Sequence, residues 1–482
     1  MRYVIGLDIG TTGTKALLIE ENGTVAGEGY KEYDLLSPAP GIFEQDAEDW
    51  WDAAKYAVRK ATEGIDKKEV AAIGLSTQGA SCLAVDENFK PLCRVISWMD
   101  SRAKEEADII AEKLGGESVY KKSGWRVSPT LDAEKVLWMK RNNKDVFKKA
   151  ASFVSTIEYI NFKLTGENVI DPTNAAIRQM LDIRTGKWDK EILDVIGIDE
   201  KRLPTVEKTG AKVGNLTAKA ADELGLTSDV VVYNGAHDQY CASLGSGATE
   251  IGDMLLATGT TWVTLGITSE PLYTESFIAP GIHPAGGYGA MASLVSAGSA
   301  LKWYKNIIDG DFKTIDKEVE KRKDSAKTLL FYPYLAGAGF PHNSPEGKAE
   351  IKGLEMRHDK YDIARALMEG VCFEAKAALD EFDKHNMPVK RLMMTGGAAK
   401  SVVWSAMVGY ISGCEIWRTS QSENCCIGAA LIAGVNCGIF GNYKEGCGLI
   451  SQPVKLETPD EEMYGYYKEK LELYRQNGRY YK

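Results

Sequence analysis

A strand–turn–strand pattern with glycine and threonine in its turn occurs twice in this 482-residue sequence. The first copy occupies residues 3–19 and contains L-D-I-G-T-T-G-T-K at 7–15; the second begins near residue 254 and contains A-T-G-T-T at 257–261. Glycine is needed in such a turn because a Cβ would obstruct both the turn and the approach of a ligand. The backbone N–H groups and threonine hydroxyls of the turn can then bind one phosphate. Either turn alone could be an ordinary hairpin, but the repetition predicts a nucleotide held between two similar domains.

The length and the order of predicted elements indicate two domains. A chain of this length is long for one hydrophobic core, so we expect two domains of roughly 200–250 residues. The boundary lies at residues 247–253, which gives domains 1–248 and 249–482. The second ends in a helical tail of alternating charged and aromatic residues, which we expect to be a surface helix. Strands joined by helices in both halves predict an α/β protein of two mixed-sheet domains around a central cleft.

Composition argues against several classes of function. The formal net charge is −10 with no basic run, which disfavours a nucleic-acid-binding surface. A strand follows the first residue almost at once, without a signal peptide, and no stretch of 18 or more apolar residues could cross a membrane. The nine cysteines are scattered and the five histidines form no i,i+4 pair, which disfavours disulfides and a zinc site. We therefore expect a cytoplasmic protein with reduced thiols.

Two aspartates at predicted strand ends are candidates for chemistry. Asp8 places a carboxylate beside the first phosphate turn, where Mg²⁺ needs an oxygen ligand. Asp238 lies just beyond an apolar strand, in G-A-H-D-Q at 235–239, and ligands of α/β sheets bind outside such strand ends. Its carboxylate could accept the proton of a hydroxyl nucleophile during phosphoryl transfer. The alternative is an N-cap for the helix that begins near residue 240.

Three further segments have both a functional and a structural interpretation. G-G-A-A-K-S at 396–401 lies between a strand and a helix, where bare backbone and the helix dipole favour an anion; the alternative is a loop without ligand. The Pro/Gly-rich loop at 332–343 either covers a cleft or is a structural loop with a solvent-facing His342. In W-M-D-S-R at 98–102, Asp100 and Arg102 either bind sugar hydroxyls or form a local ion pair.

Taken in order, these motifs resemble those of the FGGY carbohydrate kinases. The set comprises the segments at 7–15, 98–102, 235–239 and 257–261, then Y-L-A-G-A-G-F-P-H-N at 334–343, T-G-G-A-A-K-S at 395–401 and E-N-C-C-I-G-A-A at 423–430. It covers nearly the whole chain in the family's order, so it is more specific than any single motif. The resemblance implies two actin-like ATPase domains with the ribonuclease H-like fold. It also implies transfer of the γ-phosphoryl group of Mg·ATP to a sugar or polyol hydroxyl.

The resemblance implies roles for individual residues as well. Asp238 matches the catalytic base and Asp8 the magnesium ligand. The residues expected to bind ATP are Asp8, Gly10, Thr11, Thr12 and Lys15 in the first hairpin, Gly259 and Thr260 in the second, and Gly396, Gly397, Ala398 and Ser401 in the adenosine turn. The residues expected to bind the sugar are Gln78, Gly79, Asp100, Asp238 and Gln239.

The segment at 78–80 departs from two branches of the family. Xylulokinases usually carry Gln-Met-His here and glycerol kinases carry Gln-Arg-Glu, whereas this chain has Gln-Gly-Ala. This disfavours a glycerol kinase, and the small residues leave room for a bulkier or differently branched substrate. The lid-like loop also has Ala-Gly-Phe at 338–340 where many pentulose kinases have Glu-Arg-Thr. The general spacing is nevertheless most similar to the xylulokinase branch.

We therefore expect ATP-dependent phosphorylation of a ketopentose such as xylulose, or of a related ketose or polyol, with ATP and Mg²⁺ as cofactors. Gluconate, fuculose, ribulose and sugar alcohols are the alternative substrates. An actin-like or chaperone-like ATPase module without a small substrate is the alternative from another class, but such a module needs neither Asp238 nor W-M-D-S-R in this context. We expect no nucleic-acid or membrane partner, and a homodimer is one possible assembly.

Overall fold

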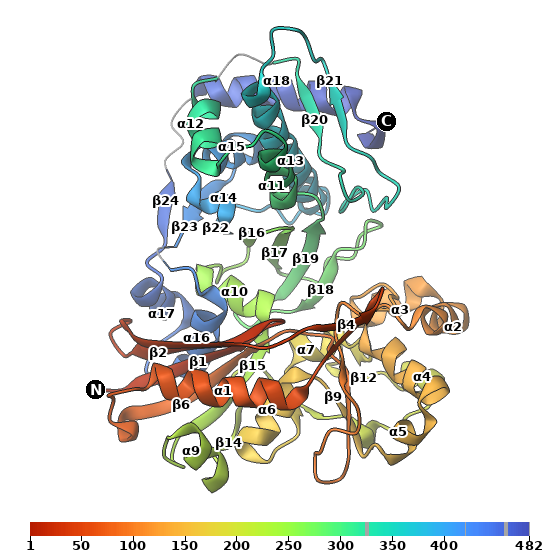
Figure 1. Ribbon diagram of the computed structural model, residues 1–482, viewed down its shortest axis with the longest axis vertical. Helices are drawn as coiled ribbons and strands as arrows, with labels where there is room; N and C mark the ends of the chain where they lie inside the picture. Colours follow the sequence, from red (N-terminus) through yellow and green to blue (C-terminus); the bar gives the residue numbers. More distant parts are fainter. Residues whose placement is uncertain (323–326, 420, 457–460, 482) are drawn as a thin grey trace. The chain divides into compact units, whose positions relative to one another are not determined.

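The computed structural model describes residues 1–322, 327–419, 421–456 and 461–481, and the chain forms two compact units (Figure 1). The first unit comprises Met1–Thr249 together with Ala279–Tyr288 and Glu423–Gln452. The second comprises Glu250–Ile278, Gly289–Ser422 and Pro453–Lys482. The main division therefore falls between residues 249 and 250, and two later segments of the chain belong to the first unit.

The first unit is built on a mixed sheet whose strands lie in the order β14 (Lys212–Asn215), β15 (Val231–His237), β6 (Val70–Thr77), β1 (Tyr3–Ile9), β2 (Gly13–Glu20) and β3 (Val25–Glu32). Strands β15, β6 and β1 are parallel neighbours, and the remaining pairs are antiparallel. Most residues of β1 and β6 are buried regardless of the face on which they lie. Burial of both faces explains why these strands are nearly continuous apolar runs.

Two helices far apart in the sequence pack on this sheet. Helix α1 (Ala47–Ala61) packs on β2 and β3, and helix α16 (Asn424–Asn436) packs on β1, β6 and β15. Close approach of α16 depends on glycine, because a Cβ added at Gly6 would lie 1.8 Å from the Cys426 carbonyl oxygen, and one at Gly74 would lie 1.9 Å from that of Ala429. Side chains alternate along a strand, so Asp8 lies on the same face of β1 as Gly6. This packing explains why residues near 430 belong to the first unit.

Helix α10 (Asp238–Ser246) follows β15 directly and packs against α16. The contact is again close, since a Cβ added at Gly428 would lie 1.9 Å from the Cys241 carbonyl oxygen. The other helices of the unit are α2 (Lys104–Leu114), α3 (Gly116–Ser123), α4 (Asp132–Asn142), α5 (Lys144–Lys149), α6 (Thr156–Thr165), α7 (Pro172–Ile177), α8 (Lys190–Ile196), α9 (Ala218–Leu224) and α17 (Tyr443–Ile450). The short strands are β4 (Leu36–Ala39), β5 (Ile42–Gln45), β7 (Leu83–Val85), β8 (Val95–Ile96), β9 (Ser152–Val154), β10 (Val169–Ile170), β11 (Leu181–Asp182), β12 (Lys187–Trp188), β13 (Thr205–Val206) and β18 (Ala279–Ile282).

A buried ionic cluster ties several helices of the first unit together. Arg178 follows α7 and is fully buried; its Nε lies 3.0 Å from Asp132 Oδ2 and its Nη1 lies 2.7 Å from Glu158 Oε1. Its Nη2 donates to the Phe153 carbonyl oxygen at 2.9 Å. Asp132 belongs to α4 and Glu158 to α6, so one guanidinium links three helical segments. The pairing compensates the high cost of burying these charges.

The second unit contains another mixed sheet, with strands in the order β19 (Tyr288–Leu294), β17 (Trp262–Thr268), β16 (Asp253–Thr258), β22 (Arg391–Gly396), β23 (Glu415–Arg418) and β24 (Val454–Leu456). Strands β16, β22 and β23 are parallel, and β16–β17 is an antiparallel hairpin like β1–β2. The helices are α11 (Gly298–Ile307), α12 (Phe312–Glu320), α13 (Lys360–Lys384), α14 (Gly397–Lys400), α15 (Val402–Ser412) and α18 (Glu461–Asn477), and a separate hairpin joins β20 (Leu330–Tyr332) to β21 (Glu350–Lys352).

The C-terminal helix α18 is not simply a surface helix, contrary to our expectation. Tyr467, Lys470 and Tyr474 are buried along one face. The Lys470 ammonium lies 2.5 Å from Glu369 of α13, and the Tyr467 hydroxyl accepts a hydrogen bond from Arg365. The alternation of charged and aromatic residues gives no sign of a buried face. Burial is possible because the lysine is paired with a carboxylate and the tyrosine hydroxyls form hydrogen bonds. Two mixed sheets with helices packed on them confirm the predicted α/β class, and no helix in the described ranges is long and apolar enough to cross a membrane.

Candidate active site

Three parallel strands of the first unit end at the same edge and bring the predicted residues together. Asp8 pairs in register with Ser76, and Ser76 pairs with Ala236 on the other side. Gln78 and Asp238 each come shortly after these paired positions, so they also lie at the carboxyl edge of the sheet. Ligands of α/β sheets bind at such an edge. The sheet register therefore gathers Asp8, Gln78 and Asp238 from three distant parts of the sequence.

Asp8 is held in an electrostatically unfavourable place. Burial, and secondarily the neighbouring carboxylates of Asp238 and Glu423, raise the pKa of Asp8 to about 7. A 2.7 Å hydrogen bond from the Ser76 hydroxyl and the charge of Lys15 act in the opposite direction but do not outweigh them. A carboxylate that lacks sufficient positive charge around it is a natural ligand for an added cation.

Asp238 does not cap the helix that it begins. His237 is the N-cap of α10, because its ring nitrogen Nδ1 accepts the Gln239 N–H at 3.4 Å. Asp238 Oδ1 lies 3.3 Å from that same Nδ1, but Nδ1 is itself an acceptor, and this buried oxygen has no hydrogen-bond partner in the described structure. We had considered Asp238 as a proton acceptor or as the N-cap of this helix. The structure shows that it is not the N-cap, and its Oδ1 has no partner that would prevent it from accepting a proton.

Two further buried acceptors near Asp238 have no donor. Gln45 Nε2 donates to the Thr11 carbonyl oxygen at 2.7 Å, and Gln78 Nε2 donates to Gln45 Oε1 at 2.9 Å. These two hydrogen bonds orient the Gln78 amide, and its Oε1 has no partner among the described residues. Oε1 of Gln239 has no partner there either. Buried polar atoms normally have a partner, so a group of three orphaned oxygens indicates a missing ligand that donates hydrogen bonds.

The segment that carries Gln78 is fixed by its backbone. The Gln78 N–H donates to the Ile9 carbonyl oxygen at 2.9 Å, and Lys135 Nζ donates to the Ala80 carbonyl oxygen at 2.6 Å. Ala80 adopts a left-handed conformation with φ of 49°, which is uncommon for a residue with a side chain. Lys135 is fully buried, and burial lowers its pKa. The hydrogen bond from this buried lysine therefore stabilises the backbone conformation of residues 78–80.

Asp100 forms the local ion pair that was one of our two interpretations. Its carboxylate accepts hydrogen bonds from the Phe43 N–H at 2.7 Å and from the Arg102 N–H, Nε and Nη2 at 2.8–2.9 Å. Those four bonds occupy the acceptor positions of a carboxylate. Direct sugar binding by Asp100, as we expected, would require one of them to break. The neighbouring Trp98 is partly exposed, and its Nε1 donates to Thr11 Oγ1 at 3.0 Å.

Lys15 is paired inside the first unit. Its Nζ lies 2.9 Å from Oε1 of Glu423, which precedes α16. Burial lowers the pKa of Lys15, but the hydrogen bond and charge of Glu423 raise it by more. Lys15 can bind phosphate only if it shares its charge with Glu423 or releases it. Sequence reasoning included Glu423 in a motif but gave it no role.

The second hairpin lies beside the 396–401 turn in the other unit. Thr258 and Gly396 pair in register on the parallel strands β16 and β22. Thr258 Oγ1 accepts the Ala398 N–H at 3.0 Å and donates to the Thr395 carbonyl oxygen. Gly259, Thr260, Gly396 and Gly397 leave their backbone exposed at this edge. The structure therefore brings together the two segments that we expected to bind phosphate and adenosine.

Glycine is required at position 396 for two reasons. Gly396 has φ of 85°, and an added Cβ would lie 2.7 Å from the Thr258 carbonyl oxygen. The turn then leads into two short helical segments, and Ser401 caps the second by accepting the Trp404 N–H at 3.0 Å. Ser401 also bonds Asp316, whose pKa is raised by burial despite that bond. The hydroxyl that we assigned to adenosine binding thus already has structural partners.

The start of helix α11 also lies beside the second hairpin, and we did not predict its role from the sequence. Helix α11 begins at Gly298, where an added Cβ would lie 2.1 Å from the Gly259 carbonyl oxygen. The Ser299 N–H donates to the Thr260 carbonyl oxygen at 2.9 Å. The signal was a glycine between two serines, S-A-G-S at 296–299, directly after an apolar strand. It marks a further turn with a glycine beside the second hairpin.

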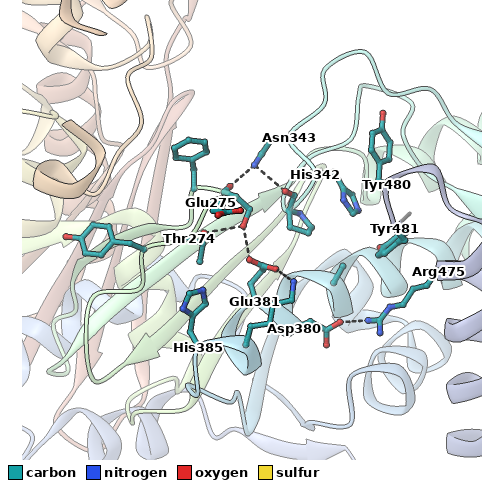
Figure 2. A pocket seen from close by; sticks show the side chains of 16 residues that line it. Thr274, Glu275, His342, Asn343, Asp380, Glu381, His385, Arg475, Tyr480 and Tyr481 are labelled. Carbon is teal, nitrogen blue, oxygen red and sulfur yellow. Dashed lines mark hydrogen bonds and ion pairs between the residues drawn. The ribbon is translucent and has the colours of Figure 1, made fainter. Parts of the chain in front are cut away.

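The loop at 332–343 is structural around His342. His342 is buried rather than solvent-facing; its Nε2 lies 3.2 Å from Glu374 Oε2, and its ring stacks on Tyr480 with a centroid separation of 5.1 Å. His342 lines a pocket of about 930 Å³ in the same unit. Figure 2 shows His342 among the side chains that line this pocket. Two cations of this pocket are already paired, Lys384 with Glu381 and Arg475 with Asp380.

Comparison with known proteins places these features in a family. The "FGGY family of carbohydrate kinases, N-terminal domain" matches residues 3–245, and the C-terminal domain of the same family matches residues 254–437. A xylulose kinase from Staphylococcus xylosus is 28% identical over 453 residues, covering 92% of this chain and 93% of that protein. A gluconokinase from Bacillus subtilis (strain 168) is also 28% identical, over 490 residues, covering 98% and 94%.

Solved structures agree with the sequence comparison. The ligand-bound xylulose kinase of Lactobacillus acidophilus superposes with a TM-score of 0.92 at 26% identity, covering 99% of this chain and 97% of that one. Both family domains match in order and together span most of the chain. The predicted family and the predicted enzyme class are confirmed. This chain belongs to the FGGY family of carbohydrate kinases and is an ATP-dependent sugar phosphotransferase.

Proposed function

We propose that this carbohydrate kinase phosphorylates a neutral ketose or polyol, most simply a ketopentose such as xylulose. The observation that carries the proposal is the group of orphaned oxygens on Gln78, Asp238 and Gln239. Each is an acceptor, and hydroxyl groups are the donors that would satisfy them. An unpaired buried polar group costs about 1–3 kcal/mol, so a polyhydroxylated ligand would recover free energy at each of these atoms.

The charges near these residues favour a neutral sugar over an aldonate such as gluconate. Lys15 is paired with Glu423, and Arg102 is paired with Asp100 and Glu44. A sugar acid would bring a carboxylate to an edge that already holds Asp8 and Asp238, and it would have to displace one of these pairs to gain a cation. Like charges at short distance disfavour ionisation of both partners.

In this proposal Asp238 is the catalytic base. Its orphaned Oδ1 accepts the proton of the sugar hydroxyl as that oxygen attacks the γ-phosphorus of ATP. Partial exposure of the side chain supports access by substrate. Gln78 and Gln239 orient the sugar, and Asp100 acts indirectly by holding Arg102 and the backbone at Phe43.

The nucleotide is assigned to the two glycine-rich edges. We assign the phosphates to Gly10, Thr11, Thr12 and Lys15 in the first unit and to Gly259 and Thr260 in the second. The adenosine is assigned to the turn formed by Gly396, Gly397, Ala398 and Ser401, where exposed glycine backbone supports contact with a flat ring. Backbone N–H groups at such turns stabilise phosphate charge without needing to reorganise.

The residues fit a magnesium ion held mainly by ATP. No cluster of three or more His, Cys, Asp or Glu side chains within the described ranges is arranged to hold a metal. Mg²⁺ is commonly held by one or two carboxylates together with phosphates and water, and the underneutralised Asp8 suits that role. When bound, the ion would offset the negative charge of the phosphates.

Cytoplasmic location is likewise a proposal, supported by the thiols. All nine cysteines lie in the described ranges and are free. Free thiols are typical of a reducing compartment. Homodimer formation stays a prediction, which sedimentation of the purified chain would check.

The substrate proposal is tested by ADP release from the purified enzyme with ATP, Mg²⁺ and a panel of D-xylulose, L-xylulose, D-ribulose, L-ribulose, xylitol, glycerol and D-gluconate. We expect one neutral ketose or alditol to give the highest kcat/KM. A higher kcat/KM for D-gluconate would overturn the neutral-sugar assignment. ADP release that no sugar of the panel stimulates would overturn the whole substrate proposal.

A further inference from the structure

The ring of His237 occupies the space that a side chain at position 79 would need. A Cβ added at Gly79 would lie 2.6 Å from His237 Cδ2 and 3.0 Å from His237 Nε2. It would also lie 2.9 Å from Cγ2 of Ile177. Contacts below about 3 Å are not tolerated between such atoms. Glycine at 79 and histidine at 237 therefore form one interlocked pair, and any larger residue at 79 has to move the ring.

His237 is fixed in position from several sides. Its N–H donates to the Thr173 hydroxyl at 2.7 Å, and Thr173 is in turn bonded to Asp171, the N-cap of α7. On the ring, Nδ1 lies within reach of the Gln239 N–H and beside Asp238 Oδ1. The edge of the ring also contacts Tyr240. The imidazole is thus anchored through its backbone and Nδ1, while Nε2 takes no part in this anchoring.

Nε2 of His237 is the remaining polar atom of the ring. The side chain is only 9% exposed, and no hydrogen bond to Nε2 is formed within the described structure. It lies against Gly79, next in the chain to Gln78, whose Oε1 is also without a partner. This nitrogen is not one of the fully buried unpaired atoms, so it keeps some access; it belongs to the residue next to Asp238 and lies against the residue next to Gln78. A ligand that donates to the unpaired oxygens of Gln78 and Asp238 would therefore lie within reach of Nε2.

We propose that His237 is a specificity-determining residue whose Nε2 hydrogen-bonds one hydroxyl of the sugar, and that Gly79 is required to admit the ring. This inference rests on the proposed function, because it concerns the same sugar site. Because Nδ1 accepts the Gln239 N–H, the ring carries its proton on Nε2, which donates it to the oxygen of the sugar hydroxyl. The enzyme should therefore discriminate against a substrate analogue that lacks this one hydroxyl, because Nε2 would then have no partner in the bound complex.

The first experiment tests which ring nitrogen of His237, Nε2 or Nδ1, is needed for activity. Glutamine places its amide nitrogen near the position of Nε2, whereas asparagine places it near Nδ1. We expect His237→Ala and His237→Asn to lower kcat/KM for the best sugar of the panel by roughly 10–100-fold, and His237→Gln to restore part of that loss. The KM for ATP should stay within about twofold of wild type, because His237 is not among the residues to which we assign the nucleotide. Unchanged sugar KM in all three variants would overturn the proposal.

Deoxy analogues of the same sugar supply the second measurement. With the analogue that lacks the contacted hydroxyl, His237→Ala should change kcat/KM by less than about threefold, because the bond is already absent. Equal losses with every deoxy analogue would show a merely structural role and would contradict the proposal. His283→Asn is a matched control, since His283 is another buried histidine of the first unit and contacts Tyr240. Its effect should not depend on which hydroxyl is missing.

Gly79 is tested in a double-mutant cycle. Gly79→Ala should lower kcat/KM strongly in the wild-type background but less when His237 is alanine, because the two closest ring contacts are gone and only the contact with the end of the Ile177 side chain remains. Equal effects in both backgrounds would overturn the interlocked pair. Folding of each variant is checked by its Tm. If the panel selects D-gluconate, the neutral-sugar assignment fails, yet the same cycle with deoxy-gluconates still decides whether His237 pairs with a substrate hydroxyl.

Discussion

The Ser76 hydroxyl on strand β6 donates a 2.7 Å hydrogen bond to Oδ1 of Asp8 on the neighbouring strand β1. This bond does not offset burial and the nearby carboxylates, so the pKa of Asp8 is raised to about 7. The enzyme therefore holds a carboxylate in a place where its charge destabilises the fold. Such a cost is typical of functional sites, where activity and stability favour different residues.

Replacing Asp8 should stabilise the protein and inactivate it. An acid whose folded pKa is raised loses stability as pH rises through that pKa, so at pH 8 the cost of the Asp8 charge is fully present. Asp8→Asn removes it and should add up to about 4 kcal/mol to the free energy of unfolding of the ligand-free protein. Urea unfolding at pH 8 measures the gain, and an ADP-release assay should show sugar-dependent turnover lost. A less stable variant would contradict this account.

Replacing Asp238 should remove turnover while leaving nucleotide binding intact. Asp238→Asn keeps the shape but not the basicity of the side chain, so kcat should fall by roughly 10²–10⁴-fold. Calorimetric titration with ATP should give a Kd within about twofold of wild type. Asp46→Asn is the matched control, because Asp46 is an exposed carboxylate whose role is to cap α1. Normal turnover by Asp238→Asn would show that another group accepts the proton.

Gly6 should tolerate no side chain because α16 lies directly above it. The Cβ of Gly6→Ala would lie 1.8 Å from a backbone oxygen of that helix. We expect the free energy of unfolding to fall by about 1–3 kcal/mol or more, as in other overpacked cores. Gly116→Ala is the control, since nothing lies within 4 Å of its added Cβ and its φ is not left-handed. A small effect at Gly6 equal to that at Gly116 would argue against the close packing of α16.

Arg178 should be essential for stability without touching the substrate site. Arg178→Met leaves Asp132 and Glu158 buried and unpaired, which should cost about 3–5 kcal/mol. The triple variant Arg178→Met/Asp132→Asn/Glu158→Gln removes the uncompensated charges and should recover much of that loss. Denaturant unfolding of both variants provides the measurement. A triple variant no more stable than the single one would contradict the charge argument.

His283 should contribute to loss of stability in acid. Its Nδ1 accepts the Ala285 N–H at 3.1 Å, its Nε2 lies 3.2 Å from the Ser243 hydroxyl, and burial lowers its pKa to about 3. A histidine whose folded pKa is depressed binds a proton only on unfolding between about pH 6.5 and 3, so stability falls as pH drops below 6.5. His283→Gln should reduce that slope by about 1.4 kcal/mol per pH unit. The free energy of unfolding of both proteins, measured at pH 7, 6, 5 and 4, checks this prediction. An unaltered slope would show that His283 does not contribute to the loss of stability in acid.

The prediction from sequence was accurate for structural features that depend on short local patterns. The two hairpins, the glycine pair at 396–397 and the aspartates at strand ends are recognisable because turns and strand ends impose local residue requirements. The α/β class followed from alternating strands and helices. The tail helix was found in the right place, but its buried face was missed, because buried lysine and tyrosine look polar until their partners are known.

Interactions between distant residues needed the tertiary structure. Asp100 had two interpretations, and only the positions of Phe43 and Arg102 show that its acceptor positions are filled. His342 was expected to face solvent in the structural interpretation, but Glu374 and Tyr480 enclose it. In each case the local sequence is compatible with both outcomes, because Phe43, Glu374 and Tyr480 lie tens of residues away along the chain from the side chains that they contact.

The sequence by itself determined the class of fold, the family and the two hairpins with glycine and threonine in their turns, because these depend on residue types at fixed local spacing. Only the tertiary structure decided that residues 424–436 pack on the first sheet, that His237 fills the space beside Gly79, and that Gln78, Asp238 and Gln239 have unpaired oxygens. The physical reason is that packing and hydrogen-bond satisfaction depend on which distant groups meet, and strand register and glycine-mediated close contacts set those meetings.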